Sequence, residues 1–219
     1  METTPYILKE FEPFSLETTI SEIKLFFKET SFSHFPVVSK NKLVGLISKT
    51  DIESIDENKK EIGYFQYLLI FFNAEENNNI LELLAIFAAN EVNIVPLIDA
   101  NKDYIGYYDL MDVLHVLNET PFLKSEGISL HLEKEIGAFS FSEICQIVES
   151  NKGHIHGLFI SESTSSMVNI TLKFSAQNVN EILQSFRRYK YQINSKHIED
   201  FYLEDLKNRS KYLQKYLNI

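Results

Sequence analysis

Cysteine, tryptophan and long apolar runs are scarce or absent in this chain of 219 residues. The single cysteine, Cys145, excludes an intrachain disulfide and a zinc site built on cysteines. The longest wholly apolar stretch, residues 83–89, is far shorter than the roughly 20 residues that a membrane helix needs. The first residues are acidic and lack the apolar core of a secretion signal. We therefore expect a cytoplasmic protein with no membrane partner.

Basic residues are also few, and the net charge of −10 is unevenly placed. Residues 1–124 hold 10 Lys or Arg against 20 Asp or Glu, whereas residues 125–219 hold 11 of each. An acidic surface repels phosphate backbones, so nucleic acid is not an expected partner. With 44% apolar residues the chain can bury a core. The difference in charge between the halves suggests two domains.

An internal repeat organises the first half. Phe-Pro-Val-Val at 35–38 recurs as Val-Pro-Leu-Ile at 95–98, and Gly45 to Asp51 corresponds to Gly106 to Asp112. Each copy follows a helical pattern, with apolar residues of 3.6-residue period near 16–27 and 80–87, and Ser15 is the expected N-cap of the first helix. Each copy therefore predicts a helix, a strand, a turn, a second strand and a helix, with a period of 60 to 61 residues.

The second half predicts a different unit. Strand patterns near 128–132, 154–160, 167–174 and 193–198 alternate with helical faces near 141–148 and 179–186. The order β-α-β-β-α-β is the ferredoxin-like arrangement. Residues 201–219 predict a terminal helix, which would pack on its own domain or form a dimer contact.

The repeated Pro-Val strand, the glycine before the next strand and the Ser/Asp-x-x-Asp helix start together resemble a tandem pair of CBS domains, a Bateman module. The second half resembles an ACT domain, with Gly137, Ala138 and Phe139 in the place of that family's ligand loop, although the proline before the glycine is replaced by Ile136. The whole order resembles the acetoin-utilisation (AcuB-type) CBS proteins. The implied fold class is α+β, with CBS repeats at 1–60 and 61–120, a linker at 121–127, an ACT-like domain at 128–200 and the helix at 201–219.

The resemblance implies regulation by an adenosine-type ligand such as AMP or ATP, bound in clefts between the repeats. The corresponding positions in this sequence are His34, Phe35, Pro36, Ser48, Asp51, Asn93, Ile94, Pro96, Asp109 and Asp112. Within them, Ser48-x-x-Asp51 is a capping-box pattern that needs no ligand. The same placement aims a carboxylate at whatever lies over the helix N-terminus. In CBS pairs the matching Ser or Thr holds phosphate and the matching Asp holds ribose.

Asp109 stands where CBS domains usually have Ser or Thr, and its charge would repel a phosphate group. The second cleft is thus expected to take a neutral adenosine compound, to need a metal, or to stay empty. Lysines near the repeats are few, which favours weak or phosphate-poor ligands.

Catalytic patterns are not apparent. Cys145 falls on an apolar helical face, and His154 with His156 lacks a third metal ligand placed by the sequence. The prediction is a non-catalytic, homodimeric sensor whose ACT-like domain binds a small molecule or mediates assembly. Two alternatives remain: an adaptor with vestigial clefts, or an enzyme using Asp51, Asp109 or Asp112 on a bound metal.

Overall fold

The computed structural model describes residues 6–194 and Tyr212. The chain divides into two compact units, residues 1–118 and 119–219, and each is described by itself. Apart from Tyr212, the helix expected at 201–219 lies outside the described residues.

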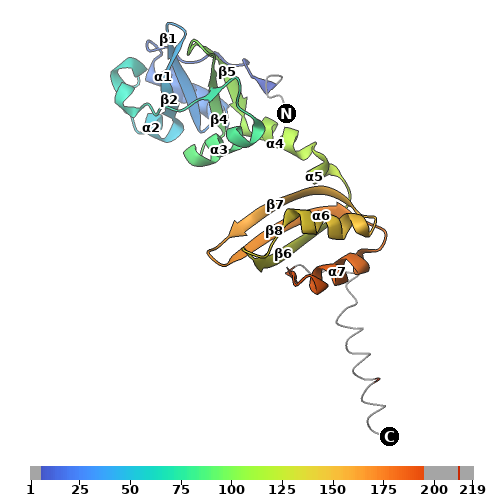
Figure 1. The fold of residues 1–219 in the computed structure, drawn as a ribbon. Coiled ribbons are helices and arrows are strands. Elements are labelled where there is room, and N and C mark those ends of the chain that lie inside the picture. Colours follow the sequence, from blue (N-terminus) through green and yellow to red (C-terminus); the bar gives the residue numbers. More distant parts are fainter. Residues whose placement is uncertain (1–5, 195–211, 213–219) are drawn as a thin grey trace. The chain divides into compact units, whose positions relative to one another are not determined.

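The first unit contains the same series of elements twice (Figure 1). Its first copy consists of α1 (Ile20–Glu29), β1 (His34–Ser39), β2 (Lys42–Ser48) and α2 (Lys49–Glu53). A 3-10 helix, η2 (Ile62–Leu68), connects it to the second copy. That copy consists of β3 (Ala74–Glu75), α3 (Ile80–Asn90), β4 (Ile94–Ile98), β5 (Tyr104–Asp109) and α4 (Leu110–Asn118).

The long helices of the two copies begin with equivalent capping boxes. Thr19 caps α1 together with Glu22, and Asn79 caps α3 together with Glu82. The prediction that Ser15 caps the first helix is wrong, because Ser15 belongs to a turn in which its backbone N–H donates to Thr18. The reciprocal bonds of Thr19 and Glu22 satisfy two backbone N–H groups at the helix start, which a lone serine cannot do.

Segments that precede each copy extend the sheet of the other one. Leu8 pairs with Tyr107 of β5 before the chain crosses over, and Phe14 then pairs with Val37 of β1. The connection between the copies repeats this course. Ile70 pairs with Leu46 of β2, and Ala74 then pairs with Leu97 of β4. The two repeats are therefore joined by main-chain hydrogen bonds in both directions.

The glycines of the repeated motif allow these crossing segments to approach closely. A Cβ at Gly45 would lie 2.9 Å from the carbonyl oxygen of Ile70. A Cβ at Gly106, whose φ is +150°, would lie 2.7 Å from the carbonyl oxygen of Leu8. Both distances are too short for a side chain, so glycine at these positions is required by packing.

The cores of the two repeats are interlocked as well. A cluster of buried apolar residues centred on α1, β1 and β2 also contains Ile94 and Tyr107 from the second repeat. The ring of Tyr107 packs edge-on against Phe35 and Phe32. A second cluster is built from α3, α4 and the strands of the second repeat. The first unit is thus one interdigitated body.

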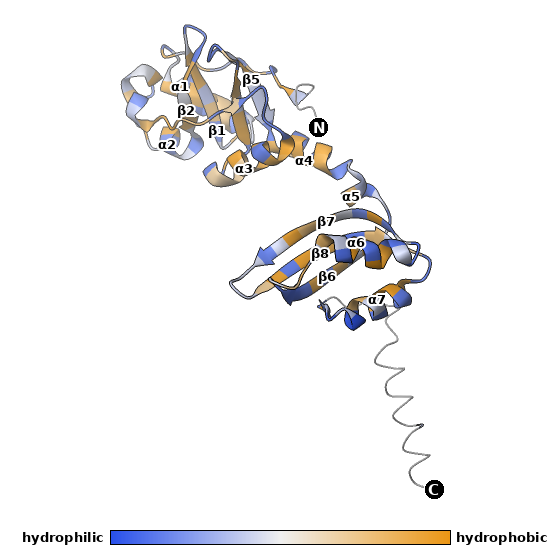
Figure 2. Ribbon diagram, viewed as in Figure 1, coloured by the Kyte–Doolittle hydropathy of each residue, from blue (hydrophilic) through white to orange (hydrophobic). Residues whose placement is uncertain are grey.

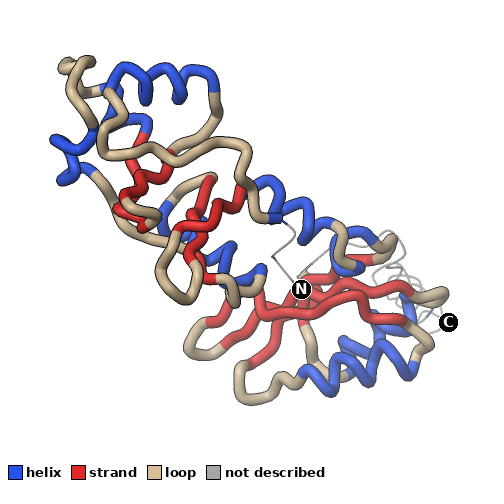
Figure 3. Tube along the Cα trace, turned by 90° about the horizontal axis from the view of Figure 1, so that it is seen from above, coloured by secondary structure: helices blue, strands red, loops and turns tan. Residues whose placement is uncertain are grey.

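The second unit is a four-stranded antiparallel sheet with two helices. Its elements are β6 (Ile128–Glu135), α6 (Phe141–Ser150), β7 (His154–Ser163), β8 (Met167–Ser175), α7 (Val179–Arg188) and β9 (Gln192–Ile193), and the strand order is β7-β8-β6-β9. Along β8 every second residue is buried, and Figure 2 shows the corresponding alternation in hydropathy. The buried residues form one core with α6 and α7, which lie on the same side of the sheet (Figure 3).

A short helix, α5 (Pro121–Lys124), occupies most of the predicted linker and packs on β7. The ring of Phe122 packs edge-on against Phe159 and would collide with a Cβ at Gly157. The Lys173 ammonium donates to the carbonyl oxygen of Leu123 at 2.9 Å. The expected α+β fold class, a duplicated unit followed by a β-α-β-β-α-β unit, is confirmed.

The glycine contacts yield a stability prediction. Gly45→Ala and Gly106→Ala should each destabilise the protein by about 1–3 kcal/mol, because the added methyl group displaces a hydrogen-bonded crossing segment. Chemical denaturation of the full chain measures this loss. Gly137→Ala is the matched control, since no atom lies within 4 Å of a Cβ there. A loss at Gly137 equal to that at Gly45 and Gly106 would refute the packing explanation.

Candidate functional site

The two repeats meet at equivalent residues that immediately precede β1 and β4. The backbone N–H and the hydroxyl of Ser33 both donate to Asn93 Oδ1, at 2.9 and 3.0 Å. In return, the backbone N–H of Asn93 donates to Ser33 Oγ at 3.3 Å, and its side-chain amide donates to the carbonyl oxygen of Ser31 at 2.8 Å. These bonds hold the starts of β1 and β4 side by side.

The same two residues hold the helix starts that follow each hairpin. The backbone N–H of Lys49 donates to the carbonyl oxygen of Ser33 at 2.9 Å, and that of Leu110 donates to the carbonyl oxygen of Asn93 at 3.0 Å. The Ser48–Asp51 and Asp109–Asp112 pairs are therefore both brought to the Ser33–Asn93 junction. We call this region the junction end of the first unit.

In the first repeat the junction end groups His34, Ser48 and Asp51. His34 and Ser48 are directly opposite each other on β1 and β2. The Ser48 hydroxyl donates to Asp51 Oδ2 at 2.6 Å and accepts from the backbone N–H of Asp51 at 2.9 Å. Ser48 is only 6% exposed, so its hydroxyl is committed to capping α2. Asp51 is partly exposed.

His34 is half-buried beside this carboxylate. Its Nδ1 lies 3.1 Å from Ser33 Oγ, whose own proton is directed to Asn93. His34 must then donate from Nδ1, which leaves Nε2 as an acceptor in the neutral ring. Burial lowers the pKa of His34, and the negative charge of Asp51 opposes this only in part. The junction end therefore carries a neutral imidazole near neutral pH.

In the second repeat, acidic residues occupy both positions that are equivalent to Ser48 and Asp51. Asp109 lies opposite Ile94, and its Oδ1 accepts from the backbone N–H of Met111 at 2.7 Å, so it caps α4. Asp112 lies in the first turn of that helix. Burial first, then the charges of Glu10, Asp109 and Asp112, raise the pKa of Tyr107 to about 12. This side is more negative than the first and has no histidine at the equivalent position.

Several of the predicted ligand residues are buried beneath the junction end. Phe35 and Ile94 have no exposed surface, and Pro36 and Pro96 are buried in their strands. Phe11 is 39% exposed, packs edge-on against Phe32 and Phe26, and lines a cavity that also contains Asn41 and Tyr104. Sequence reasoning missed Phe11 because it lies in a crossing segment that has no periodic pattern.

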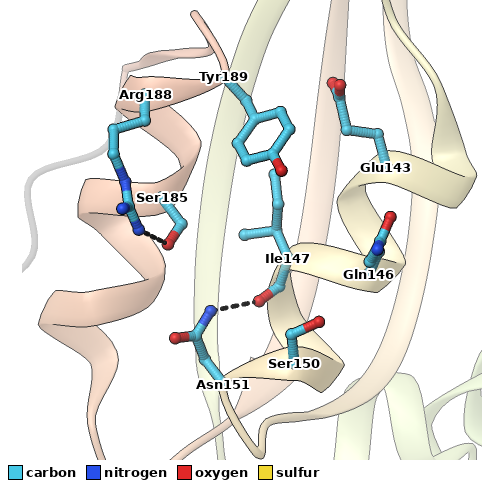
Figure 4. A pocket seen from close by; sticks show the side chains of 8 residues that line it. All are labelled: Glu143, Gln146, Ile147, Ser150, Asn151, Ser185, Arg188 and Tyr189. Carbon is cyan, nitrogen blue, oxygen red and sulfur yellow. Dashed lines mark hydrogen bonds between the residues drawn. The ribbon is translucent and has the colours of Figure 1, made fainter.

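The second unit has a cavity of about 300 Å³ between α6 and α7 (Figure 4). It is lined by Glu143, Gln146, Ile147, Ser150, Asn151, Ser185, Arg188 and Tyr189. Arg188 donates to Ser185 Oγ at 2.8 Å, and the ring of Tyr189 lies between the two helices near Ile147. Glu143 is held by Lys134 at 2.5 Å, and although burial raises its pKa, hydrogen bonds from Lys134 and Tyr191 lower it by more.

The predicted ACT-type loop lies in a turn outside this cavity. Gly137 and Ala138 belong to the turn after β6, and Ala138 and Phe139 both donate to the carbonyl oxygen of Glu135. Phe139 packs against the core of the second unit. Gly137 has no close neighbour and no positive φ, so the geometry of this turn does not demand glycine.

Residues 6–194 contain no group of three or more His, Cys, Asp or Glu side chains arranged to hold a metal ion. His156 Nε2 lies 3.0 Å from Ser175 Oγ, whereas His154 is exposed. Within the same described range, no helix is long and apolar enough to span a membrane.

Comparison with known proteins finds similarity to the CBS domain in the first unit. A model of the CBS domain matches residues 6–56. An uncharacterized protein of Methanocaldococcus jannaschii is 26% identical over 145 residues, covering 62% of this chain and 55% of its own length. Inosine-5'-monophosphate dehydrogenase of Thermoplasma acidophilum is 26% identical over 108 residues, covering 49% of this chain and only 22% of the enzyme.

Among solved structures, a CBS domain pair/ACT domain protein of Thermotoga maritima is similar with a TM-score of 0.48 and 19% identity. The match covers 54% of this chain and 98% of that one. The matches to the two sequence relatives, the protein of Methanocaldococcus jannaschii and the dehydrogenase of Thermoplasma acidophilum, cover 55% or less of the length of each relative.

The half-buried His34 yields a pH prediction. Because the pKa of His34 is lower in the folded than in the unfolded protein, the unfolded state binds more protons around pH 6. The free energy of unfolding should therefore fall as the pH drops below His34's unfolded value of 6.5, and His34→Gln should remove that part of the fall. Denaturant titrations at about pH 7.5 and about pH 5.5 measure it. The exposed His115→Gln serves as control, and an unchanged pH dependence in His34→Gln would contradict the assignment.

Proposed function

We propose that the first unit binds an adenosine-type ligand at its junction end, and that the chain is a non-catalytic regulatory protein of the AcuB type. One observation carries the proposal. The Ser33–Asn93 bonds bring a half-buried imidazole and a partly exposed carboxylate to the place where the two repeats meet.

These groups suit a nucleoside better than a polyphosphate. Asp51 has one carboxylate oxygen engaged with Ser48, so the other can accept from a ribose hydroxyl. The neutral His34 offers Nε2 as an acceptor for a base amino group. Lys49 is a nearby cation, but the unit as a whole is acidic. AMP or adenosine is therefore favoured over ATP.

The second repeat would bind such a ligand less well. Asp109 and Asp112 place two negative charges at the equivalent position, where the first repeat has Ser48 and Asp51. A phosphate brought against Asp109 would be repelled. The pair would accordingly have one competent side and one that takes only a neutral compound or nothing.

Self-association and a role for the second unit complete the proposal. Large apolar side chains are exposed on the helical face of the second repeat, including Leu81 at 69% and Met111 at 59%. Covering them with a second copy would remove apolar surface from water.

The second unit would bind a small molecule in its α6–α7 cavity or serve as an assembly surface.

The competing function is a structural adaptor whose clefts are vestigial. Two observations favour it: the Ser48 hydroxyl is already satisfied by Asp51, and Asp109 already caps α4. Both side chains would then have purely structural roles.

Ligand binding separates these functions. Isothermal titration with AMP should show binding that Asp51→Asn weakens roughly tenfold or more, because a charged hydrogen-bond acceptor for ribose is lost. Asp56→Asn, an exposed neighbour beyond α2, is the matched control and should bind like the parent protein. No heat and no thermal stabilisation with AMP, ATP or S-adenosylmethionine at millimolar concentration would favour the adaptor.

The charge at position 109 can be tested separately. Asp109→Ser supplies a helix-capping hydroxyl and removes a negative charge. The affinity of this variant for AMP should therefore rise roughly tenfold, because the repulsion between two charges several Å apart is lost. Calorimetry of this variant, with Asp99→Asn in the exposed hairpin turn as control, measures the change. An unaltered affinity would show that Asp109 does not face the ligand.

A further inference from the structure

The hairpin turns of the two repeats meet at the end of the strands away from the Ser33–Asn93 junction. The backbone N–H of Tyr104 donates to the carbonyl oxygen of Asn41 at 2.8 Å. Lys42 forms an ion pair with Asp103 at 2.8 Å and donates to the carbonyl oxygen of Asn101 at 2.5 Å. Strands of about six residues span roughly 20 Å, so this turn end is well separated from His34 and Asp51.

A cavity of about 260 Å³ opens at the turn end, beneath the first crossing segment. Its polar lining consists of Lys9 and Glu12 from the crossing segment, Asn41 from the turn after β1, and Tyr104 from β5. The cavity is therefore bordered by both repeats and by the crossing segment that precedes the first repeat.

The hydroxyl of Tyr104 is buried and has no hydrogen-bond partner among the described residues. An unpaired buried hydroxyl is costly, and native proteins satisfy nearly all such groups with protein, water or ligand atoms. Burial, together with the nearby Tyr107 and the charge of Glu12, raises the pKa of Tyr104, so the hydroxyl remains a donor that needs an acceptor.

The rest of the lining is apolar, from Phe11, Pro13, Val38 and Ile105. The cavity thus combines one cation, one anion and one hydroxyl donor with an apolar wall. A ligand that complements it has a carboxylate for Lys9 and Tyr104, an ammonium group for Glu12 and an apolar body.

We propose that this turn-end cavity binds a free amino acid with an apolar side chain, at a site distinct from the junction end. The carboxylate would accept from the Tyr104 hydroxyl, and the side chain would fill the space against Val38 and Ile105. The proposal does not depend on adenosine binding, because none of its polar residues belongs to the junction end.

Calorimetry with L-leucine and L-phenylalanine as probes tests the proposal. Binding should be lost or greatly weakened with leucinamide, which lacks the carboxylate, and with 4-methylpentanoate, which lacks the ammonium group. Tyr104→Phe should weaken binding roughly tenfold or more, the effect of one hydrogen bond to a charged carboxylate. Tyr67→Phe, which alters an exposed tyrosine, is the matched control and should leave binding unchanged.

A second measurement separates a ligand site from a structural role for the tyrosine. Because the hydroxyl is unpaired in the free protein, Tyr104→Phe should melt at the same or a higher temperature without ligand and gain less from added leucine. Equal stabilisation of both proteins by leucine would overturn the proposal. So would an absence of any stabilisation by either amino acid, which would mean that the cavity holds only water.

Discussion

The reciprocal hydrogen bonds between Ser33 and Asn93 are the constraint on which the first unit depends. They join residues 60 positions apart that occupy the same place in each repeat, immediately before β1 and β4. Their carbonyl groups in turn receive the first N–H groups of α2 and α4. As a result, the relative positions of the two hairpins and of the two acidic helix starts are fixed together. Any ligand at this junction contacts groups whose spacing both repeats determine.

Equivalent backbones nevertheless carry different chemistry at the two sides of the junction. At the junction the first repeat has a neutral imidazole, a buried serine and one carboxylate, whereas the second has a buried isoleucine and two carboxylates. Since the backbone hydrogen bonds are the same, the difference in charge alone would decide which side accepts a phosphate. This asymmetry supports the proposal of one side that accepts a phosphate-bearing adenosine compound, with the other side taking only a neutral compound or nothing.

Much of the fold follows from local patterns, because the repeat period, the helical faces and the strand alternation are encoded in neighbouring residues. The sequence shows both glycines as part of the repeat. It does not show why glycine is needed there, because the close contacts are with the crossing segments around Leu8 and Ile70. The cap of the first helix was misassigned to Ser15 because two candidate caps stand close together and only Thr19 has a glutamate to complete the box.

The helix-start residues of the candidate site were predicted from the sequence, whereas the residues packed around them were not. Ser48, Asp51, Asp109 and Asp112 were found from spacing, and the structure brings their helix starts to one junction. The burial of Phe35, the insertion of Tyr107 into the core of the other repeat and the position of Phe11 all depend on contacts between distant segments. Such contacts have no local signature, and Ser33 could have been found only by comparing it with Asn93 across the repeat.

The most direct test of the account is a titration of isotopically labelled full-length protein with AMP, followed by amide chemical shifts. The shifts should concentrate at residues 33–34, 48–51, 93–94 and 109–112, at the starts of β1 and β4 and of the helices after each hairpin. Shifts confined to the second unit or to the hairpin turns, or no shifts at saturating nucleotide, would contradict it.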